Sequence, residues 1–332
     1  LVTGPGANSI NYLNGGWTHT WQGDETKYNT IGKKTIQESL KQISSNIKYM
    51  EGCNLDSNIN TLETLEEAKN HDVIIICLSE DPAAERPADI NSLDFPEAQQ
   101  ELVKQLYKSG KPIVVISTTA RPRIMREIEP LMKSIIIAYL PGDEGGKAIA
   151  ETIFGLNNPS GKLPFTYPKY QGINIPYDHK HTEKTNRFLG QTSSLSEYEA
   201  KFKGLVYQWN FGHGLSYSKF SYSNLRINKK SYFPADTINI EVTLSNQSEI
   251  PGSEVVQVYC SDMVASITPS VKRLRGFKKI ELNGKEVATI KLSVPIKDLA
   301  FVGKQNKWVV EAGEFSLNIS NLQTKFKVVE PK

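Results

Sequence analysis

The sequence predicts two folds in succession: a mostly parallel, doubly wound α/β sandwich, and then an all-β, immunoglobulin-like sandwich. Short apolar segments without polar alternation recur up to residue 138, which is typical of strands buried on both faces of a parallel sheet. Helical patterns separate these segments, and such an order indicates βαβ units. From Asn224 onward short strands of alternating polarity follow one another, and this pattern is typical of a β-sandwich.

The elements follow from local patterns. The strands predicted in the first part are residues 1–3, 47–51, 73–78, 113–117 and 135–138. The predicted helices are residues 34–43, 61–70, 96–108 and 145–154, where apolar residues recur three and four apart. Gly110 and Gly155 are the expected ends of two of these helices. The strands predicted in the last part include residues 237–244, 254–260, 288–294 and 314–319.

A boundary is expected between the two folds. Turn-forming residues are dense between residues 157 and 170, and the stretch that follows to about residue 221 is polar and aromatic with little periodicity. An irregular stretch of this length indicates a boundary rather than a loop inside one domain. We therefore expect the boundary between the two domains to lie within residues 157–221.

Composition excludes several classes of protein. With 332 residues, 39% of them hydrophobic and 23% charged, the chain is predicted to be soluble and globular, with room for two cores. The net charge of +3, with basic and acidic residues interspersed, does not favour a nucleic-acid partner. No apolar run reaches the roughly 18 residues of a membrane span. The three cysteines are widely spaced and predict neither a disulfide framework nor a zinc site.

The strongest candidate for a site is residues 79–96, S-E-D-P-A-A-E-R-P-A-D-I-N-S-L-D-F-P, which follow the predicted strand 73–78. In open α/β sheets ligands bind outside the carboxyl ends of the strands. Neighbouring negative charge raises the pKa of a carboxyl group toward the value that a general acid needs. Any of the five carboxylates is a candidate on this pattern alone, and an ordinary solvated loop glutamate is the alternative. The five are Glu80, Asp81, Glu85, Asp89 and Asp94.

Two tryptophans stand among glycines in residues 14–23, N-G-G-W-T-H-T-W-Q-G. An indole face stacks on apolar faces of rings, including those of sugars, and flanking glycines let such a loop fold tightly. Alternatively, the indoles are buried where the loop packs down. Both interpretations stay open for Trp17, whereas burial is favoured for Trp21.

The remaining motifs carry weaker signals. The G-P-G at residues 4–6 lacks the third glycine of a dinucleotide fingerprint, and no Walker, G-x-S-x-G or H-E-x-x-H sequence occurs. His213 lies between glycines and is expected to be a turn residue or a supporting donor. Arg121 and Asp143 follow later strands and could line the same edge as Glu85, although Asp143 also suits the start of a helix.

Together these segments resemble the C-terminal part of glycoside hydrolase family 3, the β-glucosidase and exo-β-glucanase family. The resemblance rests on G-P-G-A-N-S with N-G-G-W-T-H-T-W-Q-G, S-E-D-P-A-A-E, the stretch L-P-G-D-E-G-G-K to L-P-F-T-Y-P, F-G-H-G-L-S-Y-S-K-F, and G-S-E-V-V-Q-V-Y with L-R-G-F-K-K-I-E-L. It implies a six-stranded α/β sandwich at residues 1–186, an ordered linker at 187–221 and a fibronectin type III-like domain at 222–332. In the family a (β/α)8 barrel carrying the aspartate nucleophile comes first, and we expect that barrel to be missing from this chain.

The resemblance also implies roles for individual residues. The family loop G-E-x-P-Y-x-E places Glu85 at the acid/base position and Glu80 at an earlier, structural glutamate, although Ser79 and Ala83 depart from the pattern. Trp17 matches the tryptophan that stacks on the sugar leaving the site. No metal or organic cofactor is implied, and similarity to bacterial secreted members implies the periplasm or the exterior.

The sequence therefore predicts part of a retaining exo-acting β-glucosidase that hydrolyses terminal β-D-glucosyl residues from glucosides or β-glucan oligosaccharides. The barrel aspartate would attack the anomeric carbon while Glu85 protonates the departing oxygen, and Glu85 would then activate water. The chain alone is expected to be inactive, because one carboxylate is absent. The alternatives are a non-catalytic carbohydrate-binding or scaffolding protein, and a doubly wound nucleotide binder with an appended sandwich.

Overall fold

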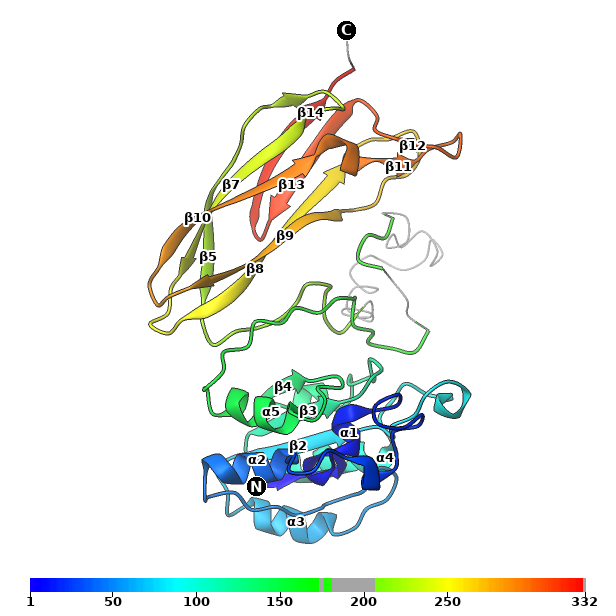
Figure 1. Cartoon of the computed structure of the whole chain (residues 1–332), viewed down its shortest axis with the longest axis vertical. Coiled ribbons are helices and arrows are strands. Elements are labelled where there is room, and N and C mark those ends of the chain that lie inside the picture. Colours follow the sequence, from blue (N-terminus) through cyan, green and yellow to red (C-terminus); the bar gives the residue numbers. More distant parts are fainter. Residues whose placement is uncertain (173–175, 181–206, 331–332) are drawn as a thin grey trace, which may run out of the picture. The chain divides into compact units, whose positions relative to one another are not determined.

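The computed structural model describes residues 1–172, 176–180 and 207–330. These residues form two compact units (Figure 1). The α/β unit consists of residues 1–157 and 168–172, and the β unit consists of residues 158–167, 176–180 and 207–330. Residues 187–206 of the predicted linker lie outside the described residues, and the domain borders at residues 186 and 222 stay predictions.

The α/β unit is built on a four-stranded parallel sheet in the order β1-β2-β3-β4. Its strands are β1 (Val2–Thr3), β2 (Ile74–Ser79), β3 (Ile113–Thr118) and β4 (Ser134–Ile137). Every residue of β2 is buried, as expected for a strand covered on both faces. The doubly wound fold predicted from the alternation of apolar strands and helices is confirmed.

Helices cover both faces of this sheet. The helices of eight residues or more are α2 (Ile36–Ile43), α3 (Thr61–Ala68), α4 (Glu97–Tyr107) and α5 (Gly145–Ile153), and α1 (Asn11–Asn14) is a single turn. One core joins α2 and α5 to Val2, Ile75, Cys77 and Ile116 of the strands, while α4 packs on β2 from the other side. The T-x-x-E sequence that starts α2 forms a reciprocal capping box between Thr35 and Glu38.

The predicted strand at residues 47–51 is wrong. This segment forms one isolated parallel bridge, Tyr49 with Val2, supported by backbone hydrogen bonds such as Met50 N to Val2 O at 3.1 Å. A longer ladder does not form because β1, its only neighbour on that side, is two residues long. The sheet accordingly has four strands in the described residues and not the six that the resemblance implies.

The β unit is a mostly antiparallel sandwich of a three-stranded sheet, β10-β7-β5, and a five-stranded sheet, β6-β14-β13-β8-β9, in which β6 and β14 pair in parallel, with a separate hairpin β11-β12. The strands are β5 (Phe220–Ile227), β6 (Ser231–Tyr232), β7 (Thr237–Asn246), β8 (Gly252–Asp262), β9 (Arg273–Leu282), β10 (Val287–Pro295), β11 (Phe301–Val302), β12 (Trp308–Val309), β13 (Gly313–Ile319) and β14 (Leu322–Val328). The predicted β-sandwich is confirmed.

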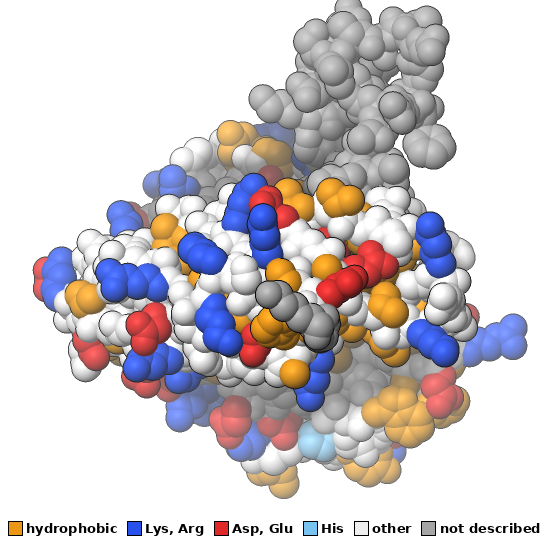
Figure 2. All heavy atoms as spheres, turned by 90° about the horizontal axis from the view of Figure 1, so that it is seen from above, with side chains coloured by type: hydrophobic (Ala, Val, Ile, Leu, Met, Phe, Trp, Pro, Cys, Tyr) orange, Lys and Arg blue, Asp and Glu red, His pale blue; other side chains and the backbone are white. Residues whose placement is uncertain are grey.

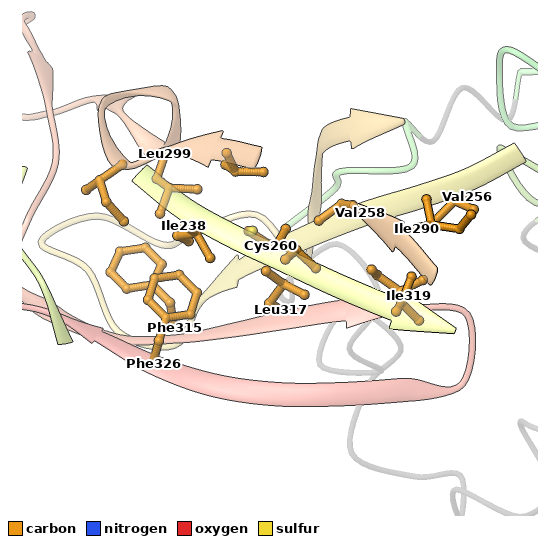
Figure 3. Close-up of a cluster of buried hydrophobic side chains, with 14 of the residues drawn as sticks. Ile238, Val256, Val258, Cys260, Ile290, Leu299, Phe315, Leu317, Ile319 and Phe326 are labelled. Carbon is orange, nitrogen blue, oxygen red and sulfur yellow. The ribbon is translucent and has the colours of Figure 1, made fainter. Parts of the chain in front are cut away.

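The core of the β unit lies between its two sheets. Alternate residues of β7 point inward and are buried, and Val256, Val258 and Cys260 of β8 face them. Figure 3 shows this cluster, in which the stacked rings of Phe315 and Phe326 lie 5.4 Å apart between their centroids. The strict alternation in β7 is the reason why the sequence revealed this strand.

Charged side chains of both signs share the described surface (Figure 2), and the cysteines are buried. On the described part of the face in Figure 2, basic and acidic side chains are interspersed, so this face carries no field of a single sign. All three cysteines are buried free thiols. Within the described ranges, no helix has the length and hydropathy that a membrane crossing requires.

Candidate active site

The carboxyl ends of the four parallel strands meet at one edge of the sheet, and the loops that leave this edge carry the predicted site residues. Residues 80–96 follow β2, residues 119–123 follow β3 and residues 138–144 follow β4. The chain after β1 passes through the 3-10 helix Pro5–Asn8 and α1 before it reaches residues 14–23. This is the edge at which open α/β sheets bind ligands.

Glu85 is exposed on the loop after β2. Its φ of 55° and ψ of −141° lie close to a backbone region that is populated essentially by glycine. Within the described residues its carboxylate has no hydrogen-bond or ion-pair partner. A strained residue with a free, solvent-facing carboxylate is costly for folding and useful for chemistry, since such backbone outliers cluster at functional sites.

Glu80 has the opposite environment. Its side chain is only 5% exposed, and its carboxylate accepts hydrogen bonds from the backbone N–H groups of Ala120 at 2.6 Å and Arg121 at 3.1 Å. It also pairs with Nη1 of Arg121 at 2.7 Å and with Nη2 of Arg123 at 2.7 Å. Glu80 is therefore a structural anchor between the loops after β2 and β3, as the resemblance implied.

The two arginines extend this anchor along the loop that carries Glu85. Arg121 donates through Nη2 to the backbone oxygen of Ala88, three residues beyond Glu85. Arg123 donates through Nη1 to the backbone oxygens of Ser92 at 3.3 Å and Asp94 at 3.1 Å. Arg121 therefore does lie at the predicted edge, where it holds the backbone of the loop.

Trp17 and Trp21 are both exposed, by 68% and 51%. The expected burial of Trp21 is therefore wrong. The loop closes through its backbone instead, because the Trp17 N–H donates to the Trp21 oxygen at 2.9 Å and a Cβ at Gly23 would lie 2.1 Å from the oxygen of Gly15. Trp17 has a φ of 60° and, like Glu85, lies in a region that non-glycine residues rarely adopt.

Gln22 joins the tryptophan loop to the loop of Glu85. Its Oε1 accepts from the N–H of Ala84 at 2.9 Å, and its Nε2 donates to the oxygen of Ala84 at 3.3 Å. The backbones also approach closely, because a Cβ at Gly16 would lie 2.6 Å from the oxygen of Ala83. The residues just before Trp17 and Glu85 thus pack against one another. Gln22 gave no sequence signal, because a loop glutamine is usually solvated.

Asp143 anchors the tryptophan loop from the other side of the edge. Its carboxylate accepts from Asn14 Nδ2 at 2.7 Å and from the Thr30 hydroxyl, and it lies 3.3 Å from Nε2 of His19. Burial acts to raise the pKa of Asp143, but the hydrogen bonds from Thr30, Asn14 and His19 outweigh it and lower that pKa. Asp143 therefore stays ionised and holds the loop.

In the acid-rich loop of residues 79–96, Asp81 has a raised pKa. Partial burial of this carboxyl is the largest cause, and the charges of Asp56 and Asp24 add to it.

Among the described residues, no three His, Cys, Asp or Glu side chains come together in a way that would hold a metal ion.

His213 lies in the β unit, where it is a turn residue as expected. Its N–H donates to the oxygen of Asn210 at 3.0 Å, and its own oxygen accepts from Leu163 at 2.8 Å. Burial, with the charge of Lys162, lowers the pKa of its imidazole.

These features define a class of protein: a doubly wound α/β domain with a carboxylate and an exposed indole on adjacent loops, combined with a β-sandwich. The family model described as "Glycosyl hydrolase family 3 C-terminal domain" matches residues 1–217, and that described as "Fibronectin type III-like domain" matches residues 254–323. The chain belongs to glycosyl hydrolase family 3. The resemblance found in the sequence motifs is confirmed.

Relatives support the same assignment. The chain is 35% identical, over 97% of its length, to a lysosomal beta glucosidase of Dictyostelium discoideum, and 31% identical, over 77% of its length, to a periplasmic beta-glucosidase of Salmonella typhimurium. It spans only 40% and 34% of those two proteins. Among solved structures, the beta-glucosidase from Listeria innocua in complex with isofagomine matches 99% of this chain and 46% of its own, with a TM-score of 0.85 and 25% identity.

Proposed function

We propose that this chain supplies the acid/base half of a retaining, exo-acting β-glucosidase, with Glu85 as general acid/base and Trp17 as a stacking surface for the sugar. The substrates are terminal β-D-glucosyl residues of glucosides or β-glucan oligosaccharides. One observation carries the proposal: Glu85 and Trp17 are exposed residues with unfavourable backbone conformations, on two loops tied together by the paired hydrogen bonds of Gln22 with Ala84.

The chemistry requires a carboxyl group that is free to exchange a proton with the substrate. Glu80 is saturated by backbone N–H groups and two arginines, so its oxygens have no free lone pair to carry the proton that a general acid donates to a glycosidic oxygen. Glu85 is exposed to solvent on the same loop. The contacts of Glu80 hold this loop to the loop after β3. Glu85 can therefore protonate the leaving oxygen and then remove a proton from the attacking water.

A retaining reaction needs a second carboxylate about 5 to 5.5 Å away as the nucleophile. The proposal assigns this group to a barrel domain outside the 332 residues. The 332-residue chain alone is then expected to leave an aryl β-glucoside unhydrolysed, and to contribute to turnover only together with a domain that supplies the nucleophile.

The decisive test uses the complete enzyme. Glu85→Ala should lower kcat by about 10²–10⁴-fold, and azide should partly restore turnover because it needs no general base. The matched control is Asp89→Asn, which removes another exposed carboxylate from the same loop and should leave kcat unchanged. Wild-type turnover of the Glu85→Ala enzyme would eliminate the proposed role.

Trp17 is tested by binding. Trp17→Ala should weaken the binding of cello- and laminari-oligosaccharides by up to roughly 10-fold, if the contact of the indole face with a sugar ring contributes as much as an aromatic pair does, about 0.5–1.5 kcal/mol. Trp21→Ala, in the same loop and also exposed, is the matched control. Equal losses in both variants would contradict the specific role of Trp17.

A second candidate is a non-catalytic carbohydrate-binding protein. The observation that favours it is that both indoles of residues 14–23 are exposed, and binding needs no nucleophile. Calorimetric titration that shows oligosaccharide binding, combined with no turnover even when the nucleophile domain is present, would support this candidate over the enzyme.

We further propose that the protein acts outside the cytosol, in the periplasm or the exterior. The relative named as periplasmic supports this location, and the one named as lysosomal supports only a location outside the cytosol. Fractionation of the native host would test it, and recovery of the protein only with cytosolic markers would contradict it.

A further inference from the structure

A cavity in the β unit is lined by residues of that unit alone, whereas Glu85 and Trp17 belong to the α/β unit. The volume of the cavity is about 230 Å³, and it lies beside β8, β9 and the hairpin β11-β12. We call it the arginine pocket and define it by Arg273, Arg275, Lys180, Asp262, Trp308 and Phe315 among its lining residues. Three of its lining residues, Cys260, Leu299 and Phe315, also belong to the core cluster in Figure 3, so the floor of the pocket is apolar.

The pocket has an excess of positive charge. Lys180, Arg273 and Arg275 line it, and Asp262 is the carboxylate among the lining residues. Arg273 has a partner, because its Nε lies 3.4 Å from Oδ2 of Asp178. Lys180 is 3.5 Å from the hydroxyl of Ser270.

Arg275 is different, because its Nε is buried and has no hydrogen-bond partner among the described residues. Within the same residues no ion pair includes Arg275. Burial, and then the charge of Arg273, lowers the pKa of the guanidinium, which nevertheless stays charged at neutral pH. A buried donor group without a partner is rare in native structures and calls for an explanation, such as a missing ligand.

The backbone around Arg275 is built irregularly. In the register of β8 and β9, Val258 pairs with Gly276 and Tyr259 pairs with Leu274, so Arg275 is the extra residue of a β-bulge. Bulges re-aim a side chain and are frequent beside functional sites. The bulge residue here, Arg275, is one of the residues that line the cavity.

We propose that the arginine pocket binds a small carboxylated sugar, a hexuronate, whose carboxylate pairs with the guanidinium of Arg275. A guanidinium presents two parallel N–H groups that match the two oxygens of a carboxylate. The proposal concerns a second site, in a different unit from Glu85, and does not rest on the proposed glycosidase function.

The other walls support a ring-bearing ligand. Trp308 lines the pocket and is 71% exposed, so its indole is available at the mouth for the apolar face of a sugar ring. Thr268 and Ser270 offer hydroxyl groups at the same cavity. The volume is below the roughly 300–1,000 Å³ of sites for drug-sized ligands, so a single sugar is the expected size.

The test is calorimetric titration of the whole chain with glucuronate, glucose and inorganic phosphate. Glucuronate should bind at least 10-fold more tightly than glucose, which has the same ring without the carboxylate. Phosphate should not displace glucuronate. Absence of heat with glucuronate, or equal affinity for glucose, would overturn the proposal, and displacement by phosphate at equal affinity would show a simple anion site instead.

Variants locate the site. Arg275→Gln should lower the affinity for glucuronate at least 10-fold. Arg226→Gln, which changes an exposed arginine of β5, should leave this affinity unchanged. Since Arg275 lies next to the core, Trp308→Ala at the exposed rim is a second variant that spares the fold, and it should weaken binding several-fold. Unchanged affinity in both pocket variants would overturn the assignment even if glucuronate binds elsewhere.

Discussion

Removal of the Glu80 carboxylate should destabilise the α/β unit more than any other single substitution in the loop after β2. Glu80→Ala leaves two backbone N–H groups, of Ala120 and Arg121, without their acceptor. It also leaves the guanidinium of Arg121 and that of Arg123, whose side chain is 8% exposed, without a counter-ion. The variant therefore creates uncompensated charge at a nearly buried position.

The magnitude follows from these contacts. Removing one partner of a buried ion pair typically costs about 3–5 kcal/mol, because the other charge stays buried. For domains of this size each kcal/mol shifts the Tm by about 2–4 °C, so the Tm of the α/β unit should fall by roughly 6–20 °C. Glu80→Gln keeps one acceptor for the backbone N–H groups but turns an amide donor toward the arginines. Because it removes the same negative charge, its cost should be close to that of Glu80→Ala.

The assay is thermal and denaturant unfolding, followed by tryptophan fluorescence in a background where Trp209 and Trp308 of the β unit are replaced by Phe, so that Trp17 and Trp21 report on the α/β unit. Glu85→Gln is the matched control, since it neutralises a glutamate five residues further along the same loop. Because the Glu85 carboxylate has no partner among the described residues, the control should change the unfolding free energy by less than about 0.5 kcal/mol. A loss below 1 kcal/mol in Glu80→Ala, or a loss in Glu85→Gln as large, would refute the assignment of anchor and free carboxylate.

Three further predictions concern the loop of residues 14–23. Gln22→Ala should speed hydrogen exchange of the Ala84 amide about 10-fold, since that N–H loses its 2.9 Å acceptor. Gln22→Glu keeps an acceptor and should protect this amide. Equal exchange rates in the two variants would contradict the role of Gln22 in joining the two loops. Gly23→Ala should lower the free energy of unfolding by about 1–3 kcal/mol, because φ of Gly23 is +77° and the new Cβ would lie 2.1 Å from the Gly15 oxygen. An unchanged Tm would contradict this prediction. The pKa of Asp143 is lowered from 3.8 on folding, so its stabilising effect is present above that pH and is lost as pH falls through the folded value. Tryptophan fluorescence should report this acid transition in the wild type, and Asp143→Asn should lack it.

Much of the fold could be read from local patterns, because its signals lie within single elements. The run I-I-I-C-L-S of β2 is buried on both faces and carries no alternation, and the capping box of Thr35 and Glu38 marks the start of α2. In the β unit, β7 alternates strictly because only one of its faces meets the core. Hydrophobic burial imposes these periodicities directly on the sequence.

Errors arose where partners far apart in the sequence decide the structure. Residues 47–51 have the composition of a strand, but their neighbour β1 is too short to pair with more than one residue. Trp21 was expected to be buried because tryptophan usually is, yet its loop closes through backbone hydrogen bonds and leaves the indole 51% exposed.

The sequence by itself determined the family, the two folds and the choice of Glu85 and Trp17 as candidates, since motifs and periodicity are local properties. The family resemblance gave Glu80 and Glu85 different roles, but only the tertiary structure revealed the physical difference: Glu80 is buried and fully paired, and Glu85 is exposed. The tertiary structure alone revealed that Gln22 ties the two loops across 62 residues of sequence. The physical reason is that burial and hydrogen bonding depend on which side chains from distant parts of the chain arrive at the same place.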